Sequence, residues 1–332
     1  MNHMSSPPAM PALPIRHYPR AAAQPGGDKA PPLPLIPARW MVGALVLNGL
    51  VVGALMARSG VLIDWRNPAF LLFCAVNVGL VGLLAWGRRR AAGGDVRLHD
   101  FASHGLMLMF LTMFGAVASY QAATYSSGFY DAALERADQM LHFNWLAWYG
   151  VVVRHPLLQR LGAGVYASAW VTPWVLVFYH SLTGGQAQLR AYLASFWLGA
   201  SLTIALFPLI PAKGALDFLW HGPIPYMPTN GLWQGIVIPQ LRAHTFGKIE
   251  FTALRGLVCA PSFHTVCALT NIAAVWRVAR LRWWLLPLNL AMLLATPVEG
   301  EHYLTDMLLG ALVTALALGL VRMVVMPLAA RA

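Results

Sequence analysis

Residues 302–324 read HYLTDMLLGALVTALALGLVRMV, an apolar stretch of membrane-spanning length with a polar beginning. A transmembrane helix needs about 20 consecutive apolar residues, so this stretch is long enough to cross a bilayer. Two of its first five residues, His302 and Asp306, can carry a charge near neutral pH. Because an aspartate inside an apolar span is energetically costly, it is a functional-site hypothesis by default. The stretch therefore predicts both a membrane fold and a polar site at one end of a span.

The composition of the whole chain agrees with a membrane fold. Of the 332 residues, 58% are hydrophobic and 11% are charged, whereas a soluble domain carries about 25% charged residues. The net charge of +11 does not indicate nucleic acid, because the basic residues cluster at the ends of apolar stretches, as is typical of membrane proteins. The three cysteines are scattered and provide neither a disulfide framework nor a metal-site spacing.

We expect an all-α integral membrane protein with about eight transmembrane helices. Residues 1–38 are rich in Pro and Ala and predict a disordered, basic tail. Two transmembrane helices within residues 39–100 should precede six further helices, which form the core at residues 101–326. The expected spans lie near residues 40–57, 69–87, 104–123, 164–183, 189–210, 262–279, 283–298 and 302–324.

Two segments of the core are too polar to cross a membrane. Residues 131–160 mix Trp, Tyr, Leu and charged residues, as an interfacial amphipathic helix does. Residues 211–260 form a long loop, and such loops are often lids or binding surfaces. For both segments, a solvated connector is an equally good interpretation.

The positions of the basic residues predict the orientation in the membrane, because cytoplasmic loops carry an excess of Lys and Arg. With eight spans, 14 of the 23 basic residues fall on one side, among them those of the tail and the cluster Arg88, Arg89 and Arg90. Both termini are then cytoplasmic, and the surface that carries His302 faces the opposite side. We expect a bacterial inner membrane with the site facing the periplasm.

The His302–Asp306 spacing suits a histidine nucleophile. On a helix, residues four apart lie on one face, one turn from each other. An aspartate that accepts a hydrogen bond from one imidazole nitrogen fixes the tautomer and raises the basicity of the other nitrogen. Attack of that nitrogen on phosphorus would give a phosphohistidine and split one displacement into two easier ones. A structural His–Asp pair that ties two helices together is the alternative.

A second motif, Pro261-Ser262-Phe263-His264, is predicted to start another helix on the same membrane side. Ser262 suits an N-cap, and free backbone N–H groups at a helix start bind phosphate oxygens. His264 would then be placed to protonate a departing alkoxide, whereas an interfacial histidine is the alternative. Lys213, at the end of an earlier span, could hold the phosphate as a point charge or could snorkel to the membrane surface.

These motifs resemble those of the type-2 phosphatidic acid phosphatase superfamily, over roughly residues 104–324. That family has a basic motif, then P-S-x-H, then S-R-x(5)-H-x(3)-D. The resemblance implies a six-helix core preceded here by two extra helices, with His302 as nucleophile, His264 as general acid and Asp306 as orienting carboxylate. It also implies that no metal takes part. We further expect Ser262 and Lys213 to bind the substrate and no cofactor to be needed.

The chain departs from the family pattern at two places. Thr296 stands where the third motif has its phosphate-binding arginine, and the first motif is reduced to Lys213 with Trp220 and His221 in place of Arg-Pro. With these departures the chain looks more like the inositol phosphorylceramide synthase branch, whose members move a phospho-headgroup from a phospholipid to a lipid hydroxyl.

Three functions are therefore considered. The first is a phosphotransferase with a phospholipid donor and a lipid acceptor. The second is a phosphatase that uses the same residues on phosphatidic acid or a polyprenyl pyrophosphate, with water as the acceptor. The third is a non-catalytic transporter or scaffold, although transporters often show internal repeats and no repeat is visible here. The bilayer is the expected partner, nucleic acid is not, and the oligomeric state stays open.

Overall fold

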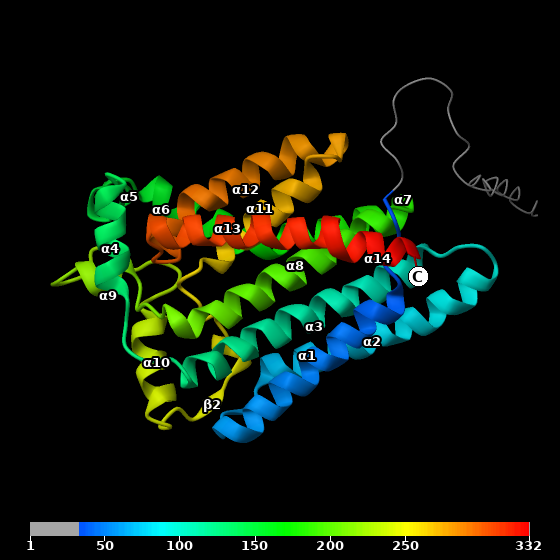
Figure 1. Ribbon diagram of the computed structural model, residues 1–332, viewed down its shortest axis with the longest axis horizontal. Coiled ribbons are helices and arrows are strands. Elements are labelled where there is room, and N and C mark those ends of the chain that lie inside the picture. The colour runs from blue at the N-terminus through cyan, green and yellow to red at the C-terminus, as the bar shows by residue number, and fades with distance from the viewer. Residues whose placement is uncertain (1–32, 332) are drawn as a thin grey trace, which may run out of the picture. The chain divides into compact units, whose positions relative to one another are not determined.

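The computed structural model describes residues 33–331, which are mostly helical (Figure 1). The expected tail falls mostly on residues 1–32, outside the described part. The elements in chain order are α1 (Ala38–Ser59), β1 (Leu62–Ile63), α2 (Pro68–Ala92), α3 (Arg97–Thr124), α4 (Asp131–Met140), α5 (Trp145–Arg154), α6 (Pro156–Ala167), η1 (Ser168–Trp170), α7 (Val171–Thr183), α8 (Gln186–Leu206), η2 (Phe207–Leu209), α9 (Ala215–Leu219), α10 (Trp233–Arg242), β2 (Lys248–Ile249), η3 (Phe251–Ala253), α11 (Phe263–Val275), α12 (Ala279–Glu299), α13 (Leu304–Leu320), the π-helix η4 (Val321–Val325) and α14 (Met326–Arg331).

Seven helical segments of the described chain are long and apolar enough to cross a membrane, which confirms an all-α membrane protein. The sixth expected span, 262–279, is instead the shorter apolar helix α11, Phe263–Val275, of 13 residues. Such a helix is about 20 Å long, less than the roughly 30 Å hydrocarbon core of a bilayer. The count of eight spans therefore stays a prediction. The seven segments are Ala38–Ser59, Pro68–Ala92, Arg97–Thr124, Pro156–Thr183, Gln186–Leu209, Ala279–Glu299 and Leu304–Arg331.

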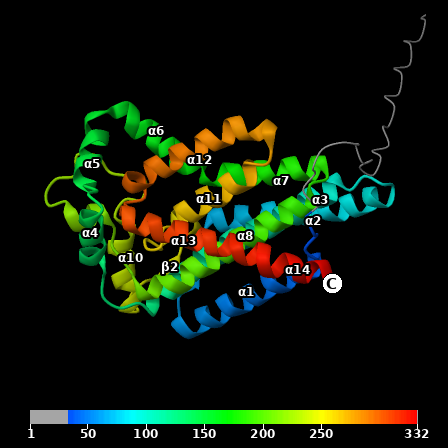
Figure 2. The same cartoon turned by 45° about the horizontal axis from the view of Figure 1, so that its top comes forward.

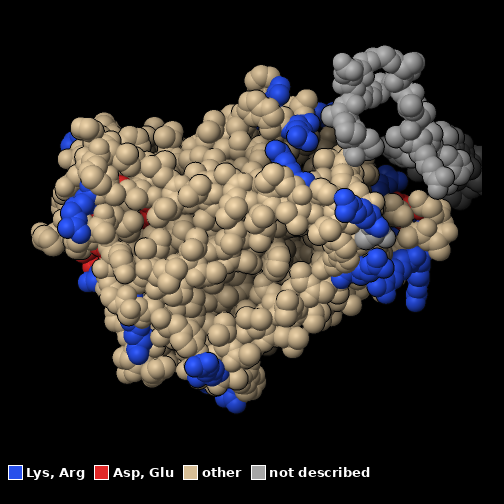
Figure 3. All heavy atoms as spheres, in the orientation of Figure 1, with Lys and Arg blue, Asp and Glu red and all other residues tan. Residues whose placement is uncertain are grey.

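The long helices of residues 33–331 lie side by side, so their connections collect at two ends. In both Figure 1 and Figure 2, α4, α5 and α10 lie at one end, where Figure 1 also shows α9, whereas the α2–α3 connection and α14 lie at the other. On the face shown in Figure 3, Lys and Arg side chains lie toward the ends and along the top and bottom edges, and the middle of the face is free of charge. An uncharged band between two charged ends is the pattern of a protein that spans a bilayer.

The expected interfacial helix at 131–160 is broken into α4, α5 and the first part of α6. Asn144 ends the α4–α5 turn by accepting a hydrogen bond from the backbone N–H of Ala147, at 2.9 Å, so α5 begins there. Pro156 occupies the first turn of α6, where its missing N–H costs nothing. Because α6 continues through η1 into α7, this span begins at residue 156 rather than near 164.

Buried polar side chains tie four apolar helices together. The Tyr192 hydroxyl of α8 donates to Asn271 Oδ1 of α11 at 2.8 Å. Asn271 Nδ2 donates to Asn289 Oδ1 of α12, and Asn289 Nδ2 donates to Thr172 Oγ1 of α7, both at 3.0 Å. Polar groups with no access to water must be satisfied within the protein, so this chain of hydrogen bonds fixes α11 against its neighbours.

The long loop 211–260 contains α9, α10, η3 and the strand β2. Residues 248 and 249 pair in parallel with residues 62 and 63, which links the loop to the α1–α2 connection. Val237, Ile238 and Leu241 of α10 are buried in one apolar cluster with Tyr120 of α3. The segment is therefore a folded layer over one end of the helices.

Candidate active site

The starts of α11 and α13 are held together by backbone contact. The N–H of Ser262 donates to the backbone oxygen of Asp306 at 2.9 Å. Gly310 makes this approach possible, because a Cβ at that position would lie 2.6 Å from the Ser262 oxygen. Ser262 is the N-cap of α11, as expected, and its Oγ accepts from the Thr265 N–H at 3.3 Å. The two motifs, about 40 residues apart in sequence, thus meet at one end of the helices.

His302 and Asp306 form a buried pair. The two carboxylate oxygens of Asp306 lie 3.2 and 3.3 Å from Nδ1 of His302, and the exposed fractions of the two residues are 2% and 0%. His302 lies before α13 rather than in its first turn, because α13 begins at Leu304. Oδ2 of Asp306 also accepts from the Tyr303 N–H at 3.1 Å, which holds the chain against the helix start. Nδ1 is therefore engaged, and Nε2 is the nitrogen left for chemistry.

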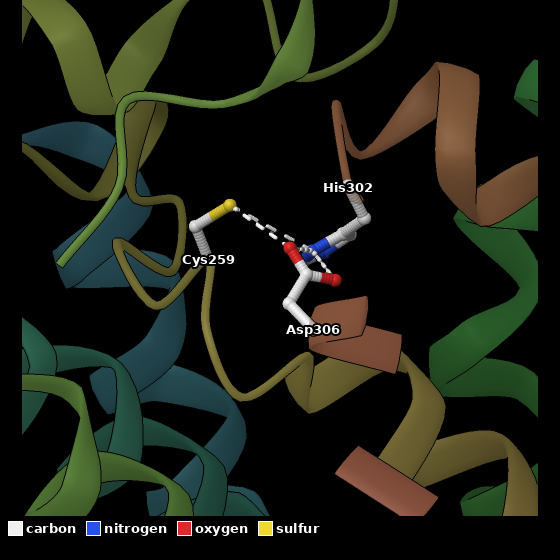
Figure 4. Close-up of side chains that lie close together, drawn as sticks. All are labelled: Cys259, His302 and Asp306. Carbon is white, nitrogen blue, oxygen red and sulfur yellow. Dashed lines mark hydrogen bonds and ion pairs between the residues drawn. The ribbon is translucent and has the colours of Figure 1, made fainter. Parts of the chain in front are cut away.

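Cys259 adds a third buried group to this pair (Figure 4). Its Sγ lies 3.3 Å from Asp306 Oδ2, to which it donates, and 3.9 Å from His302 Nδ1. Burial raises the pKa of the Cys259 thiol well above its ordinary value, with the nearby Asp306 carboxylate as a further cause. The thiol is therefore a protonated donor that steadies the carboxylate, and it was not identified from the sequence.

The same three side chains could hold a metal ion. Their ligand atoms all lie within 4.8 Å of one another, and Cys, His and Asp are ligand types that zinc accepts. Each of these atoms, however, already lies at hydrogen-bonding distance from another member of the group. Hydrogen bonding among the three accounts for the arrangement without an ion.

His264 faces the pair from the first turn of α11. The centroids of the His264 and His302 rings lie 6.0 Å apart, with an interplanar angle of 59°. On its other side, Nδ1 of His264 lies 3.0 Å from the hydroxyl of Tyr166, and the two rings stack with centroids 4.2 Å apart. The structure thus brings together His264, His302 and Asp306, the three residues expected to carry the chemistry.

Two aspartates of α4 hold the segment that carries His302. Asp138 accepts from the backbone N–H groups of Leu304 and Thr305 at 2.8 and 2.7 Å, so it caps α13 from another helix. Asp131 accepts from the Tyr303 hydroxyl at 3.1 Å and from the Lys213 N–H at 3.0 Å. The polar face of the α4 segment therefore points inward to the site.

Lys213 is bound through its backbone, and its side chain points to an aromatic ring. Its Nζ lies 5.4 Å from the ring centroid of Phe129, a ring that the Arg242 guanidinium also approaches, at 4.4 Å. A cation over an aromatic face is attracted by the ring quadrupole. The structure thus places the Lys213 ammonium at Phe129, and a contact with a phosphate at the two histidines stays a prediction.

Two glutamates before His302 hold the 211–260 layer in place. Glu299 accepts from the Tyr226 hydroxyl at 2.7 Å and from the Thr229 hydroxyl at 2.6 Å. Glu301 accepts from the Leu232 N–H at 2.8 Å through Oε1, while Oε2 has no hydrogen-bond partner among the described residues. Burial raises the pKa of Glu301 to about 7, so the unpartnered oxygen suits a protonated carboxyl.

Thr296, which replaces the family's arginine, bonds to its own helix. Its hydroxyl donates to the Met292 carbonyl at 2.7 Å and the residue is fully buried. Trp220 likewise donates locally, to the Pro223 carbonyl at 3.1 Å. At these two family positions the chain therefore presents locally bonded side chains instead of guanidinium groups.

Two facing histidines with a buried aspartate, at one end of apolar helices, define the class of the site, and a family comparison agrees. The sequence profile of the PAP2 superfamily matches residues 132–320, more than half of the chain. The protein belongs to the PAP2 superfamily. No curated protein and no solved structure matches it. Membership indicates phosphatase or phosphotransferase activity on lipid-like substrates.

The side chains missed by the sequence reasoning come from outside the two motifs. Tyr166, Asp131 and Asp138 lie 98 to 172 residues from their partners in the site. For the aspartates the sequence held a weak signal, because the segment that forms α4 carries several charged residues in a chain that is mostly apolar. Tyr166 had none, since a tyrosine near the start of the expected span, 164–183, is ordinary at a membrane interface.

Proposed function

We propose that the protein is a membrane lipid phosphotransferase, closest in function to the inositol phosphorylceramide synthase branch. It moves a phosphate-containing headgroup from a phospholipid donor to a lipid hydroxyl acceptor through a phosphohistidine. The observation that carries the proposal is the pair of rings 6.0 Å apart with Asp306 behind one of them. One tetrahedral phosphate between the rings could contact both.

The first step breaks the bond between phosphorus and the diacylglycerol oxygen. Nε2 of His302 attacks phosphorus, while Nδ1 keeps its hydrogen bond to Asp306, which stabilises the developing positive charge on the ring. His264 gives the proton of its Nε2 to the departing alkoxide. Diacylglycerol leaves, and the phospho-headgroup stays on His302.

The second step reverses these roles with a new alcohol. The acceptor hydroxyl attacks phosphorus, its proton passes to His264, and the His302 nitrogen–phosphorus bond breaks. The headgroup is then an ester of the acceptor lipid, and both histidines return to their first states. Backbone N–H groups at the Ser262 cap supply hydrogen bonds to the phosphate oxygens, and Lys213 adds a positive charge nearby.

Two observations support transfer over hydrolysis. His302 and Asp306 are almost completely buried beneath the folded 211–260 layer, and a site that excludes water favours a lipid acceptor. The arginine expected for a phosphate monoester is replaced by the locally bonded Thr296, and a phosphodiester carries less charge than a monoester. A phosphatase that uses the same residues is the alternative, and membership of the superfamily supports it equally.

The membrane side is also part of the proposal. If α11 counts as a crossing, both described ends of the chain lie on the side that carries most arginines, which we assign to the cytoplasm. The two histidines then face the periplasm of a bacterial inner membrane. The two helices of residues 39–100 stand before the six-helix catalytic core, 101–326.

Product analysis of purified protein tests the proposal. A phospholipid labelled in its headgroup phosphate is supplied with and without a ceramide or diacylglycerol acceptor, to wild type and to His302→Ala. Transfer predicts label in a new lipid only when the acceptor and His302 are both present. Release of water-soluble label whatever the acceptor would establish the phosphatase instead, and turnover by His302→Ala would refute both.

A further inference from the structure

Among the aromatic rings around His264, the ring of Tyr166 lies nearest to the imidazole. Its hydroxyl lies 3.0 Å from His264 Nδ1, and its ring stacks on the imidazole with centroids 4.2 Å apart and planes 24° apart. Tyr166 is 8% exposed and lies at the end of α6, in a segment that the two sequence motifs do not include. Both the position and the plane of the imidazole are thus defined by one tyrosine.

Gly300 leaves the space that this contact needs. A Cβ at residue 300 would lie 2.8 Å from the Tyr166 hydroxyl and 2.5 Å from Cδ2 of His302. The backbone of Gly300 has φ −100°, which any residue can adopt. Space rather than backbone conformation therefore calls for glycine here, and the Tyr166 hydroxyl reaches a point beside both histidines.

We propose that Tyr166 is the positioning residue of His264 and that it directs His264 Nε2 toward the scissile ester oxygen. The proposal rests on the proposed function, in which His264 is the proton donor. A hydroxyl oxygen beside Nδ1 can accept the Nδ1–H, and this proton stays in place in both the imidazolium and the neutral ring. Nε2 is then the atom that gains and loses a proton.

The proton movements balance through the reaction. In the first step the Nε2 proton of the imidazolium moves to the lipid alkoxide, and neutral His264 keeps Nδ1–H donating to Tyr166. In the second step Nε2 takes the proton of the acceptor hydroxyl, and the imidazolium is restored. Tyr166 loses no proton in either step, because its oxygen only accepts. A neutral acceptor stabilises the imidazolium less than a carboxylate would, so His264 releases its Nε2 proton more readily.

A packing role would need only the stacked ring. Phenylalanine keeps the ring and removes the hydroxyl, so Tyr166→Phe separates positioning from packing. Tyr192→Phe is the matched control, because Tyr192 is also a buried tyrosine with a hydrogen-bonded hydroxyl, and its partner is Asn271 in the helix core.

The readout is the dependence of the first step on the leaving group. A lipid alkoxide is strongly basic and needs a proton to depart, whereas p-nitrophenolate leaves without one. We compare release of diacylglycerol from the lipid donor with release of p-nitrophenol from the p-nitrophenyl ester of the same headgroup phosphate. Single-turnover release isolates the first step from the acceptor reaction.

Positioning predicts that Tyr166→Phe lowers the ratio of lipid to p-nitrophenyl rate by about tenfold or more, because even a small misplacement of a reacting group is costly. Tyr192→Phe should leave this ratio within about twofold of wild type. Equal losses on both substrates, or no loss, would overturn the proposal in favour of packing. Thermal unfolding of both variants in detergent should match, which excludes misfolding as the cause.

The failure of the proposed function gives a different result. His264→Ala should show at least the same selective loss on the lipid donor, and His302→Ala should release neither product. Turnover by His302→Ala would reject the proposed mechanism itself. A selective loss in His264→Ala with an unchanged ratio in Tyr166→Phe would reject only the role of Tyr166.

Discussion

Asp138 binds Thr305 twice, accepting from its backbone N–H at 2.7 Å and from its hydroxyl at 2.6 Å. The two residues belong to α4 and α13, 167 positions apart. A helix start has unpaired backbone N–H groups, which are usually capped by a residue just before the helix. Here a fully buried carboxylate from a distant helix supplies the cap. The position of His302 thus depends on α4.

Loss of this cap should weaken the whole fold. Asp138→Ala leaves the Leu304 and Thr305 N–H groups without an acceptor, and we expect the free energy of unfolding to fall by about 2 to 3 kcal/mol. Asp138→Asn should lose less, because one amide oxygen can still accept. The exposed neighbour Arg136 provides the control, Arg136→Ala, which should change stability by less than about 0.5 kcal/mol. Equal stabilities of the alanine variants in detergent would contradict this role.

Gly300→Ala should reduce lipid turnover by about tenfold or more while the protein still folds. The new methyl group would overlap Cδ2 of His302 at 2.5 Å, so the nucleophile or its neighbour Tyr166 must shift, and small displacements at a reacting centre are costly. Gly247→Ala is the matched control, since no atom lies within 4 Å of its Cβ position. Full turnover by Gly300→Ala would show that the histidine tolerates displacement.

The carboxyl of Glu301 should make stability depend on pH. Burial raises its native pKa from 4.5 to about 7, so between these values the native state binds a proton that the unfolded state has released. Stability should therefore fall as pH rises from about 4.5 to about 7, by up to about 3 kcal/mol, and then level off. Glu301→Gln keeps an oxygen for the Leu232 N–H and should remove this slope. An unchanged slope of unfolding temperature against pH in the variant would refute the assignment.

Metal removal should leave turnover unchanged. Cys259, His302 and Asp306 are close enough to hold an ion. The three side chains are instead hydrogen-bonded to one another, and the Cys259 thiol is protonated. Treatment with EDTA is therefore expected to have no effect, and Cys259→Ser, which keeps a hydrogen-bond donor, should retain most activity. Loss of turnover after EDTA with recovery on adding Zn²⁺ would instead assign a metal site to this group.

The spans and the two motifs were predictable because both signals are local in sequence. Apolar runs of about 20 residues identify membrane-spanning helices, and Ser262, a preferred N-cap residue, predicts the start of α11. The length of α11 was overestimated, since Trp276 and the residues after it are apolar or basic but leave the helix. The spacing of His302 and Asp306 also predicts that both lie on one helical turn, whereas His302 precedes α13. The hydrogen bond from the Tyr303 N–H to Asp306 holds this preceding segment close to the carboxylate.

The supports of the site could not be predicted in this way. Tyr166, Cys259 and Asp138 act through contacts between segments that only the folded chain brings together. The mixture of apolar and charged residues in the 131–160 segment predicts an interfacial amphipathic helix or a solvated connector. Its aspartates instead point inward, where they satisfy backbone N–H groups of α13 and of residues 213–214. A buried acidic cap and a surface charge have the same sequence pattern.

The central claim is that His302 forms a covalent bond to phosphorus, and trapping that intermediate tests it most directly. Wild-type protein is mixed with a phospholipid labelled in its phosphate, quenched in alkali within one turnover, and digested for peptide mapping. We predict label on the peptide that carries His302, stable in alkali and lost in acid, and absent from His302→Ala. Label on another residue, or lipid turnover by His302→Ala, would contradict the mechanism.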